Sequence, residues 1–533
     1  MSPDTPSAPV VIAGAGPVGL ALAVGLAHHG IESVVLEDDE SPSAHSKAPG
    51  LLCRTLEIFR AWGVLDRFME EGFFVTRPHI WMAGEETPRA TIDFSVLADL
   101  TAVPGVLILP QNRTEGLLRE RLTRSGLSDV RFGHRVVRFD QDGSGVSVRV
   151  ERKAGSAYEL RGHYLVGCDG AHSTVRETLG WPLEGTTYPT RLVLADVQLP
   201  DQRNDLPWPR LAGDDQQVLA AIRIEPRLWR VIATVDRRMS DEAATGAPEI
   251  ARKVDRLFGP GSFECVWANV FRIHCRTSPH FRLGRVLLAG DAAHINSPAG
   301  GQGMNSGIQD AHNLAWKLDR ALRGGVSEPL LASYEAERRP AILTSVDRYT
   351  DLLTRAFLLP PRAVRSSLAR LARAVVSQPF VMRRLVPRAV MLDTRYRSSP
   401  LISGRGRWLG ARAPDGPLRA RDGRDVRLLD LTRRDAALLL FDDGRLPGWD
   451  VSQVQQLASD VPGLGVCRIV PPSPADGDSG DLVDATGSLA RMWQPGAALA
   501  ALVRPDGYVG WMAERPSREE LRTGVRRALG VAA

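Results

Sequence analysis

The chain has 533 residues, with 67 lysines and arginines against 62 aspartates and glutamates, so its net charge is only +5. A chain of this length usually contains more than one hydrophobic core, so we expect two or three domains. Positive and negative charges nearly balance, and no arginine cluster is interleaved with aromatic residues, which argues against a nucleic-acid-binding surface. The cysteines are scattered and form no C-x-x-C pair, which disfavours a disulfide framework or a metal site and favours the reducing cytoplasm.

An almost wholly apolar stretch at residues 10–27 predicts a buried strand followed by a helix. Glycines and Pro17 interrupt the stretch, and no basic flank precedes it, as a signal peptide would require. No other part of the sequence approaches the roughly 20 uninterrupted apolar residues of a membrane span. We therefore expect no membrane-spanning helix.

The turn inside this stretch, GAGPVG at residues 14–19, has the spacing G-x-G-x-x-G between a predicted strand at 10–13 and a predicted helix at 20–29. In this context Gly14 permits the tight turn, Gly16 lets a pyrophosphate approach the backbone, and Gly19 lets helix and strand pack closely. The start of the helix offers free N–H groups and a favourable dipole to phosphates. The pattern predicts a dinucleotide-binding turn without identifying the dinucleotide.

Two further strand ends carry acidic residues that suit the same kind of ligand. A predicted strand at 33–36 ends at Glu37, 23 residues after Gly14, where a carboxylate accepts hydrogen bonds from a ribose. A strand at 164–168 leads into D-G-x-x-S-x-x-R, which contains Asp169 and Arg176. These positions extend the predicted nucleotide site along the edge of the sheet.

A third motif begins with a predicted strand at 285–289, followed by GDAAH at 290–294 and a glycine-rich stretch before a predicted helix at 306–318. The aspartate at the strand end can hold polyol hydroxyls. A glycine-rich turn that opens a helix offers backbone N–H groups to a negatively charged group. The motif therefore predicts a second clamp, which a simple NAD-dependent dehydrogenase would not need.

Together the segments GAGPVG, CDGAHSTVR and GDAAHINSPAGGQGMNSGIQDA resemble the class A FAD-dependent aromatic hydroxylases. Within them, the sequence is most similar to the phenol hydroxylase-like branch, which includes hydroxylases that tailor aromatic polyketide antibiotics. The resemblance continues through residues 48–57, 109–111, 392–396 and 502–511, and so covers essentially the whole chain. It implies an α/β fold with a discontinuous Rossmann-type FAD-binding domain, a β-sheet substrate domain and a C-terminal thioredoxin-like domain.

This resemblance implies domain boundaries: an FAD-binding domain at 1–75, 105–185 and 270–345, a substrate-binding sheet at 76–104 and 186–269, a helical segment at 346–403, and the thioredoxin-like domain at 404–533. Alternating residues at 217–224 and 230–235 favour strands of the sheet. The basic, amphipathic stretch 364–376 favours a helix that packs on the FAD domain or on a partner in a homodimer over one that lies on a membrane. Because thioredoxin chemistry needs two neighbouring thiols and the last domain contains only Cys467, we expect it to be structural.

The resemblance also assigns FAD contacts. They fall on Gly14, Gly16, Pro17 and Gly19 at the pyrophosphate, Glu37 at the ribose, Lys47, Arg54, Gln111 and Val136 elsewhere along the cofactor, Asp169 and Arg176 in the D-G motif, Asp291 at the ribitol, and Pro298, Gly301, Gly303, Met304 and Asn305 around the isoalloxazine. Lys47 replaces an arginine common in relatives and cannot make a bidentate contact. Asp169 and Arg176 could serve both FAD and the nicotinamide, or form an ion pair that braces the loop.

The expected reaction is hydroxylation of an aromatic or phenolic, polyketide-like small molecule with O2 and either NADPH or NADH. The resemblance implies that reduced FAD forms a C4a-hydroperoxide with O2 and passes one oxygen to the ring, in an apolar pocket between Pro298 and the 186–268 sheet. Relatives carry an aspartate as general base where this sequence has Pro49. Other candidates are weak: His45, Arg54, His274 and His294. For each of the three histidines, a structural hydrogen bond is the better explanation. We therefore assign no general base.

Two alternatives remain open at the level of sequence. Baeyer–Villiger insertion or epoxidation could use the same flavin chemistry on this scaffold, since only the pose and protonation of the substrate differ. A non-catalytic dinucleotide-binding protein would retain the glycine turn. Flavin absorbance together with substrate-stimulated oxidation of NAD(P)H separates the second alternative from an oxygenase.

Overall fold

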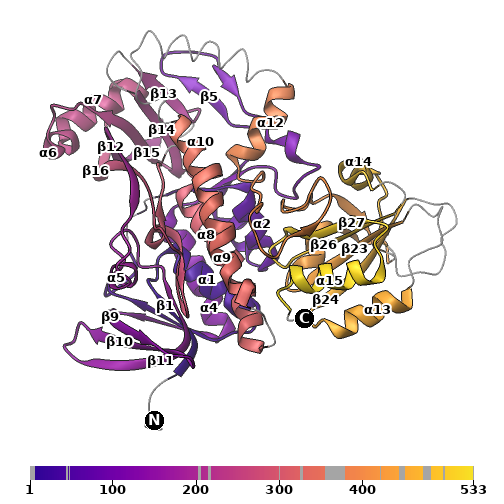
Figure 1. Ribbon diagram of the computed structural model, residues 1–533. Helices are drawn as coiled ribbons and strands as arrows, with labels where there is room; N and C mark the ends of the chain where they lie inside the picture. Colours follow the sequence, from indigo (N-terminus) through magenta and orange to yellow (C-terminus); the bar gives the residue numbers. More distant parts are fainter. Residues whose placement is uncertain are drawn as a thin grey trace.

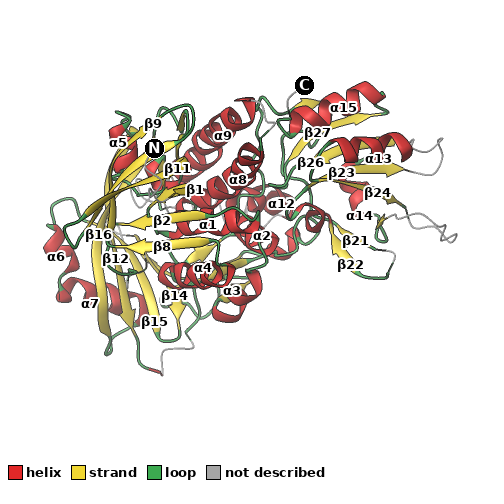
Figure 2. Ribbon diagram, turned by 90° about the horizontal axis from the view of Figure 1, so that it is seen from below, coloured by secondary structure: helices red, strands yellow, loops and turns green. Residues whose placement is uncertain are grey.

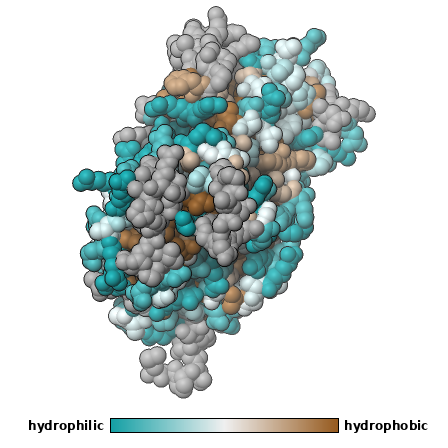
Figure 3. Space-filling model, turned by 90° about the vertical axis from the view of Figure 1, so that its right-hand side faces the viewer, coloured by the Kyte–Doolittle hydropathy of each residue, from teal (hydrophilic) through white to brown (hydrophobic). Residues whose placement is uncertain are grey.

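The computed structural model describes residues 7–43, 46, 48–201, 206–213, 218–298, 300–324, 328–353, 379–420, 422–442, 451–471, 482–495 and 498–531. Two large sheets and their helices occupy one side of the molecule, and the C-terminal part, drawn from orange to yellow, lies beside them (Figure 1). Among the described helices, none combines the length and apolarity that crossing a bilayer requires. On the face in Figure 3 the described residues are mostly hydrophilic, with separate apolar areas.

The first sheet has the strand order β17-β18-β11-β1-β2-β8, and β9 and β10 extend it through β11. Its strands are β1 (Ser7–Ala13), β2 (Ser33–Glu37), β8 (Ser128–Phe132), β9 (His134–Gln141), β10 (Val146–Arg152), β11 (Ala157–Gly167), β17 (Arg282–Leu283) and β18 (Val286–Leu288). The pairs β1–β2, β1–β11, β2–β8 and β11–β18 are parallel. The carboxyl ends of β1, β2, β11 and β18 therefore meet at one edge, which is where ligands bind in open α/β sheets.

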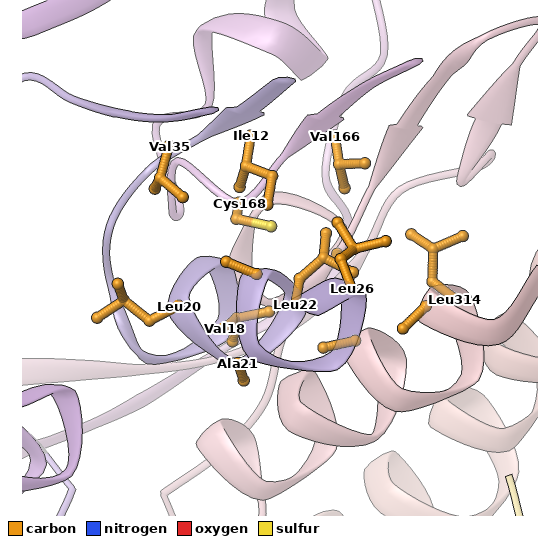
Figure 4. Packing of buried hydrophobic residues seen from close by; sticks show 14 of the residues in the cluster. Ile12, Val18, Leu20, Ala21, Leu22, Leu26, Val35, Val166, Cys168 and Leu314 are labelled. Carbon is orange, nitrogen blue, oxygen red and sulfur yellow. The ribbon is translucent and has the colours of Figure 1, made fainter. Parts of the chain in front are cut away.

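Helix α1 (Pro17–His28) lies between this sheet and α8 (Gly303–Arg323), and it is apolar because both of its sides are covered. Figure 4 shows Leu22 and Leu26 of α1 among Ile12 and Val166 of the sheet and Leu314 of α8. Further helices on the same part are α2 (Cys53–Ala61), α3 (Leu65–Glu71), α4 (Gln111–Ser125), α5 (Thr174–Thr178), α9 (Glu328–Ala341), α10 (Arg348–Leu353) and α12 (Pro379–Ala389). A small sheet beside them consists of β3 (Gly50–Leu51), β4 (Phe73–Val75) and β7 (Val106–Ile108).

The second sheet has the order β19-β16-β12-β15-β14-β13-β5-β6. Its strands are β5 (His79–Met82), β6 (Ala90–Thr91), β12 (Glu184–Gln198), β13 (Arg210–Gly213), β14 (Val218–Glu225), β15 (Leu228–Val235), β16 (Glu264–Thr277) and β19 (His294–Ile295). One face packs on α7 (Ala247–Phe258), which follows the short α6 (Asp241–Thr245), through residues such as Val193, Val231 and Val254. Because strand side chains alternate, Leu194 and Ile232 point to the opposite face.

The C-terminal sheet has the order β20-β27-β26-β23-β24-β25-β21-β22, with β23 parallel to β24 and antiparallel to β26. Its strands are β20 (Ser403–Gly404), β21 (Pro417–Arg419), β22 (Asp425–Arg427), β23 (Ala436–Asp442), β24 (Leu464–Val470), β25 (Leu482–Val483), β26 (Ala498–Val503) and β27 (Val509–Glu514). Helices α13 (Val451–Asp460) and α15 (Arg518–Ala528) cover one face, and α14 (Ser488–Trp493) packs on the other (Figure 2). This mixed sheet between helices agrees with the expected thioredoxin-like architecture.

Two predicted segments, residues 425–431 and residues 364–376, compare with the structure as follows. The sequence of residues 425–431 predicts a single strand, but β22 ends at Arg427 and Leu428–Thr432 forms a 3-10 helix. The carboxylate of Asp430 accepts a hydrogen bond from the Arg427 N–H, 3.0 Å away, and so caps this turn. The amphipathic helix expected at 364–376 lies outside the described residues.

Candidate cofactor and substrate site

The glycine turn at the end of β1 shows why each glycine is needed. Gly14 has φ 100°, and a Cβ there would lie 2.4 Å from the carbonyl oxygen of Cys168. A Cβ on Gly19 would lie 1.9 Å from the carbonyl oxygen of Gly14. A Cβ on Gly16 would meet nothing within 4 Å. Gly14 and Gly19 therefore serve packing, whereas Gly16 leaves open space in front of the first N–H groups of α1, where a phosphate binds favourably.

This difference predicts how alanine at Gly16 should behave. Gly16 has φ −70°, which alanine adopts without strain, so Gly16→Ala should fold with an unchanged melting temperature of the ligand-free protein. The added methyl group should weaken binding of the predicted FAD by about tenfold or more, because it occupies the space of the phosphate. Titration of ligand-free protein with FAD, followed by flavin fluorescence, measures the change. Unchanged affinity would show that the pyrophosphate does not lie against Gly16.

Glu37 closes the turn from the end of β2. Its Oε2 accepts a hydrogen bond from the Ala15 N–H, 2.7 Å away, and its Oε1 accepts one from the Asp39 N–H, 3.1 Å away. These two bonds hold the carboxylate at the edge of the cavity. Each carboxylate oxygen can accept a further hydrogen bond, so the arrangement suits a ribose diol.

Asp169, which follows β11, presents a carboxylate oxygen that suits a polar ligand. Its Oδ2 accepts a hydrogen bond from the Val175 N–H, 3.1 Å away, at the start of α5. Its Oδ1 is buried and has no hydrogen-bond partner among the described residues, and burial raises the pKa of this carboxyl. A buried carboxylate oxygen without a donor is costly, so this atom is suited to a hydroxyl or bound water of a polar cofactor.

Arg176 does not pair with Asp169, so the expected ion pair between them is wrong. Its buried guanidinium donates hydrogen bonds to the carbonyl oxygens of Ala171, 3.0 Å away, and Ala292, 3.4 Å away, and it pairs with Glu177. Arg176 thereby joins the D-G loop to the G-D-A-A-H turn behind the cavity. A contact between Arg176 and the nicotinamide stays a prediction.

These loops surround one long cavity of about 690 Å³, within the usual range for cofactor and ligand sites. Most of the predicted residues line it: Gly14, Gly16, Pro17, Glu37, Gln111, Val136, Asp169, Asp291, Pro298, Gly301, Gly303 and Met304. The lining includes the glycine turn and the ends of β1 and β2, the first residues of α8, and residues of the second sheet. The structure thus places residues from all three motifs, far apart in sequence, around a single space.

Besides Arg176, three further predicted residues among those described do not line the cavity. Gly19 packs against Gly14, as described above. Arg54 is buried, donates to Glu57, 2.9 Å away, and to the carbonyl oxygen of Asp506, and so faces the C-terminal part of the chain. It does not line the cavity, and its contact with FAD stays a prediction.

Asn305 likewise acts from behind. Its side chain accepts from the Leu52 N–H, 2.9 Å away, and donates to the carbonyl oxygens of Gly50 and Gly301, at 2.9 and 2.8 Å. It fixes two loops that line the cavity and does not line it directly. Lys47 lies outside the described residues.

The second sheet supplies apolar side chains to the cavity lining, and the sequence did not single these residues out individually. Leu194 of β12 lies opposite Ile232 of β15, and Ile222 of β14 lies opposite Arg230 of β15. The fully buried Arg230 guanidinium makes two hydrogen bonds of 2.8 Å to Asp196, which balances its charge. Alternation along 217–224 and 230–235 indicated a two-faced sheet, but only strand register shows which side chains meet at the cavity.

The two described histidines among the weak candidates for a general base, His274 and His294, do not line this cavity. His45 lies outside the described residues. His274 lies 2.9 Å from Thr187 Oγ1, and burial lowers the pKa of its imidazole. His294 is fully buried against Asp310. Both described histidines therefore make structural hydrogen bonds.

Comparison with known proteins agrees with this geometry. Residues 7–349 match the FAD binding domain family, and residues 406–532 match the aromatic-ring hydroxylase C-terminal family. The 12-dehydrotetracycline 5-monooxygenase/anhydrotetracycline 6-monooxygenase of Streptomyces rimosus is 36% identical over 523 residues, which cover 95% of each chain. A probable NADH-specific resorcinol 4-hydroxylase of Rhodococcus jostii is 29% identical over 94% of this chain and 91% of that protein.

Solved structures give the same result. An anhydrotetracycline hydroxylase from Streptomyces rimosus superposes with a TM-score of 0.78 and 32% identity, covering 99% of this chain and 100% of that one. A ternary complex of aklavinone-11 hydroxylase with FAD and aklavinone gives a TM-score of 0.81 at 25% identity, covering 98% and 99%. These matches extend through both large sheets and the C-terminal part.

Proposed function

The chain belongs to the family of FAD-binding aromatic-ring hydroxylases, and from this premise we propose that it hydroxylates a neutral, polycyclic phenol or hydroxyquinone of the polyketide type. The predictions of an α/β fold, an FAD-dependent monooxygenase and a nicotinamide co-substrate agree with these relatives. The identity of the substrate, the choice between NADPH and NADH, the homodimer and the cytoplasmic location stay predictions.

The apolar residues of the second sheet that line the cavity carry the proposal about the substrate. Leu194, Ile222 and Ile232 come from three neighbouring strands and present aliphatic side chains to the same space. Such a surface suits the face of a fused ring system. Arg230, which lies opposite Ile222, is already paired with Asp196, so it offers little to a substrate carboxylate. Both features favour a flat, uncharged substrate.

The chain's own residues can hold FAD along the rest of the cavity. Gly16 and the start of α1 would bind the pyrophosphate, Glu37 the ribose, and Asp169 and Asp291 the hydroxyls of the polyol. Bound FAD supplies oxygen activation, with electrons from NADPH or NADH. Pro298 and the aliphatic sheet residues would exclude water from the space where flavin and substrate meet.

No proton acceptor stands where phenol hydroxylase-like relatives carry their aspartate. Pro49 lines the cavity at that position, and its carbonyl oxygen accepts a hydrogen bond from the Leu109 N–H, 2.7 Å away. Among the described lining residues that belong to β12, β14 and β15, Arg230 alone is titratable. This favours a substrate whose ring hydroxyl ionises without enzymatic help, as hydroxyquinones and polycyclic phenols do more readily than phenol.

Purified protein should show flavin absorbance and should oxidise NADPH or NADH faster when a tricyclic or tetracyclic hydroxyquinone is present. The matched control is the same ring system with a carboxylate, which should stimulate oxidation less, since the apolar surface would have to desolvate its charge. Product analysis should show an added ring hydroxyl. A protein that holds FAD but responds only to carboxylated or single-ring phenols would contradict the substrate class; a lactone product would contradict hydroxylation.

A further inference from the structure

The turn at residues 290–296 carries three residues that line the cavity, Asp291, Ile295 and Asn296, yet its backbone is held from the opposite side. The Gly290 N–H donates a hydrogen bond to Oδ2 of Asp310, 3.1 Å away. In the middle of the turn, Arg176 donates to the Ala292 carbonyl oxygen, 3.4 Å away. Gly290 has φ 60° and no side chain to fix it, so its conformation depends on such bonds.

Asp310, on α8, is fully buried and gathers several donors besides Gly290. His294 Nε2 lies 2.7 Å from its Oδ2, and Arg338 Nε of α9 lies 2.6 Å from its Oδ1. Arg338 donates a further hydrogen bond to the Ser306 carbonyl oxygen, 3.1 Å away. One carboxylate therefore joins the turn to both long helices behind the cavity.

His294 extends this connection to the other end of the turn. Its Nδ1 lies 3.0 Å from Asn296 Oδ1, while its Nε2 faces the Asp310 carboxylate. Both neighbours are acceptors, so the geometry suits an imidazolium that donates from both nitrogens. Burial alone would lower the pKa of His294, but the charge of Asp310 and the hydrogen bonds to Asp310 and Asn296 together raise it.

We propose that Asp310 is a positioning residue for the FAD clamp, because it fixes both ends of the turn: Gly290 directly, and Asn296 through His294. The front of the turn must stay open for the cofactor, so its conformation has to be set from behind. Asp291 would then face the FAD polyol only while Asp310 holds Gly290. This role of Asp310 concerns the binding of FAD and is independent of which substrate the protein uses.

The variant Asp310→Asn tests this proposal because it keeps the shape and an acceptor for Gly290 but removes the charge that faces His294 and Arg338. The dissociation constant of FAD, measured by fluorescence titration of ligand-free protein, should rise about tenfold. The matched control is Asp415→Asn, another buried aspartate, whose carboxylate pairs with Arg427 in the C-terminal part. It should leave FAD affinity unchanged.

A pH series separates positioning from general loss of stability. The charged groups near His294 are Asp310 of α8 and Arg338 of α9. Arg176 of α5 reaches the same turn at Ala292. The titratable Tyr334 of α9 lies against Phe281, whose ring stacks on His294. The protonated form of His294 is the one that holds Asn296. FAD affinity of the wild type should therefore fall as the pH rises through the pKa of His294. In Asp310→Asn this loss should begin at lower pH.

Equal FAD affinity and equal pH dependence in Asp310→Asn and the wild type, with only a lower melting temperature, would overturn the proposal. If Asp310→Asn does not fold, His294→Asn gives a second test. That variant should bind FAD more weakly and without the alkaline loss of affinity. Wild-type affinity with a wild-type pH profile in His294→Asn would equally contradict the role of Asp310.

Discussion

Replacing Asp291 with alanine should yield protein that purifies largely without FAD. Asp291 follows β18 in the turn at 290–296 and lines the cavity beside the start of α8. Hydrogen bonds to a charged group contribute about 1.5–3 kcal/mol each, so losing two to the polyol hydroxyls should lower affinity by roughly 100-fold or more. The ratio of flavin to protein absorbance after purification, followed by titration with FAD, measures the loss.

The ligand-free form provides the control within this experiment. Asp291 is exposed, so Asp291→Ala should melt near the temperature of ligand-free wild type. Asp255→Ala, an exposed aspartate on α7 outside the cavity lining, should retain full FAD occupancy. Full occupancy in Asp291→Ala would show that another residue binds the polyol.

The cofactor half of the site could be predicted from the sequence because its chemistry is local. Backbone groups of the glycine turn bind phosphate, so a strand, three glycines and a helix specify Gly14, Gly16 and their neighbours within a few residues. Glu37 and Asp169 follow the same logic, since parallel strands bring their carboxyl ends to one edge. A short segment therefore predicts both the structure and its ligand.

The remaining assignments depend on partners that lie far away in sequence. Arg54 resembles a family position near FAD, yet its guanidinium meets the carbonyl of Asp506, 452 residues later. Asn305 binds Gly50 and Leu52, more than 250 residues earlier, and so stands behind the lining. No local pattern contains these pairings. The cavity residues proposed to contact the substrate could not be predicted for the same reason, since the pairing of Leu194 with Ile232 depends on strand register.

The junction between the FAD-binding part and the C-terminal part contains charges that are completely removed from water. Glu337 of α9 accepts hydrogen bonds from Arg504, at 2.6 and 2.9 Å, and from Lys317 of α8, 2.7 Å away. Arg504, which directly follows β26, also pairs with Asp506. These side chains are at most 1% exposed. Each charge is stable here because its partners are present.

Replacing Arg504 with methionine should therefore lower the free energy of unfolding by about 3–5 kcal/mol, because Asp506 loses its cation and Glu337 loses one of two. Denaturant unfolding followed by tryptophan fluorescence measures the change. The control is Arg433→Met, since Arg433 pairs with Asp430 at the surface and should contribute less than about 1 kcal/mol. An equal effect of the two substitutions would mean that the buried network does not hold the parts together. A large effect confined to Arg504→Met would imply that the C-terminal part stabilises α8 and α9, and through Asp310 and Arg338 the turn that holds the cofactor.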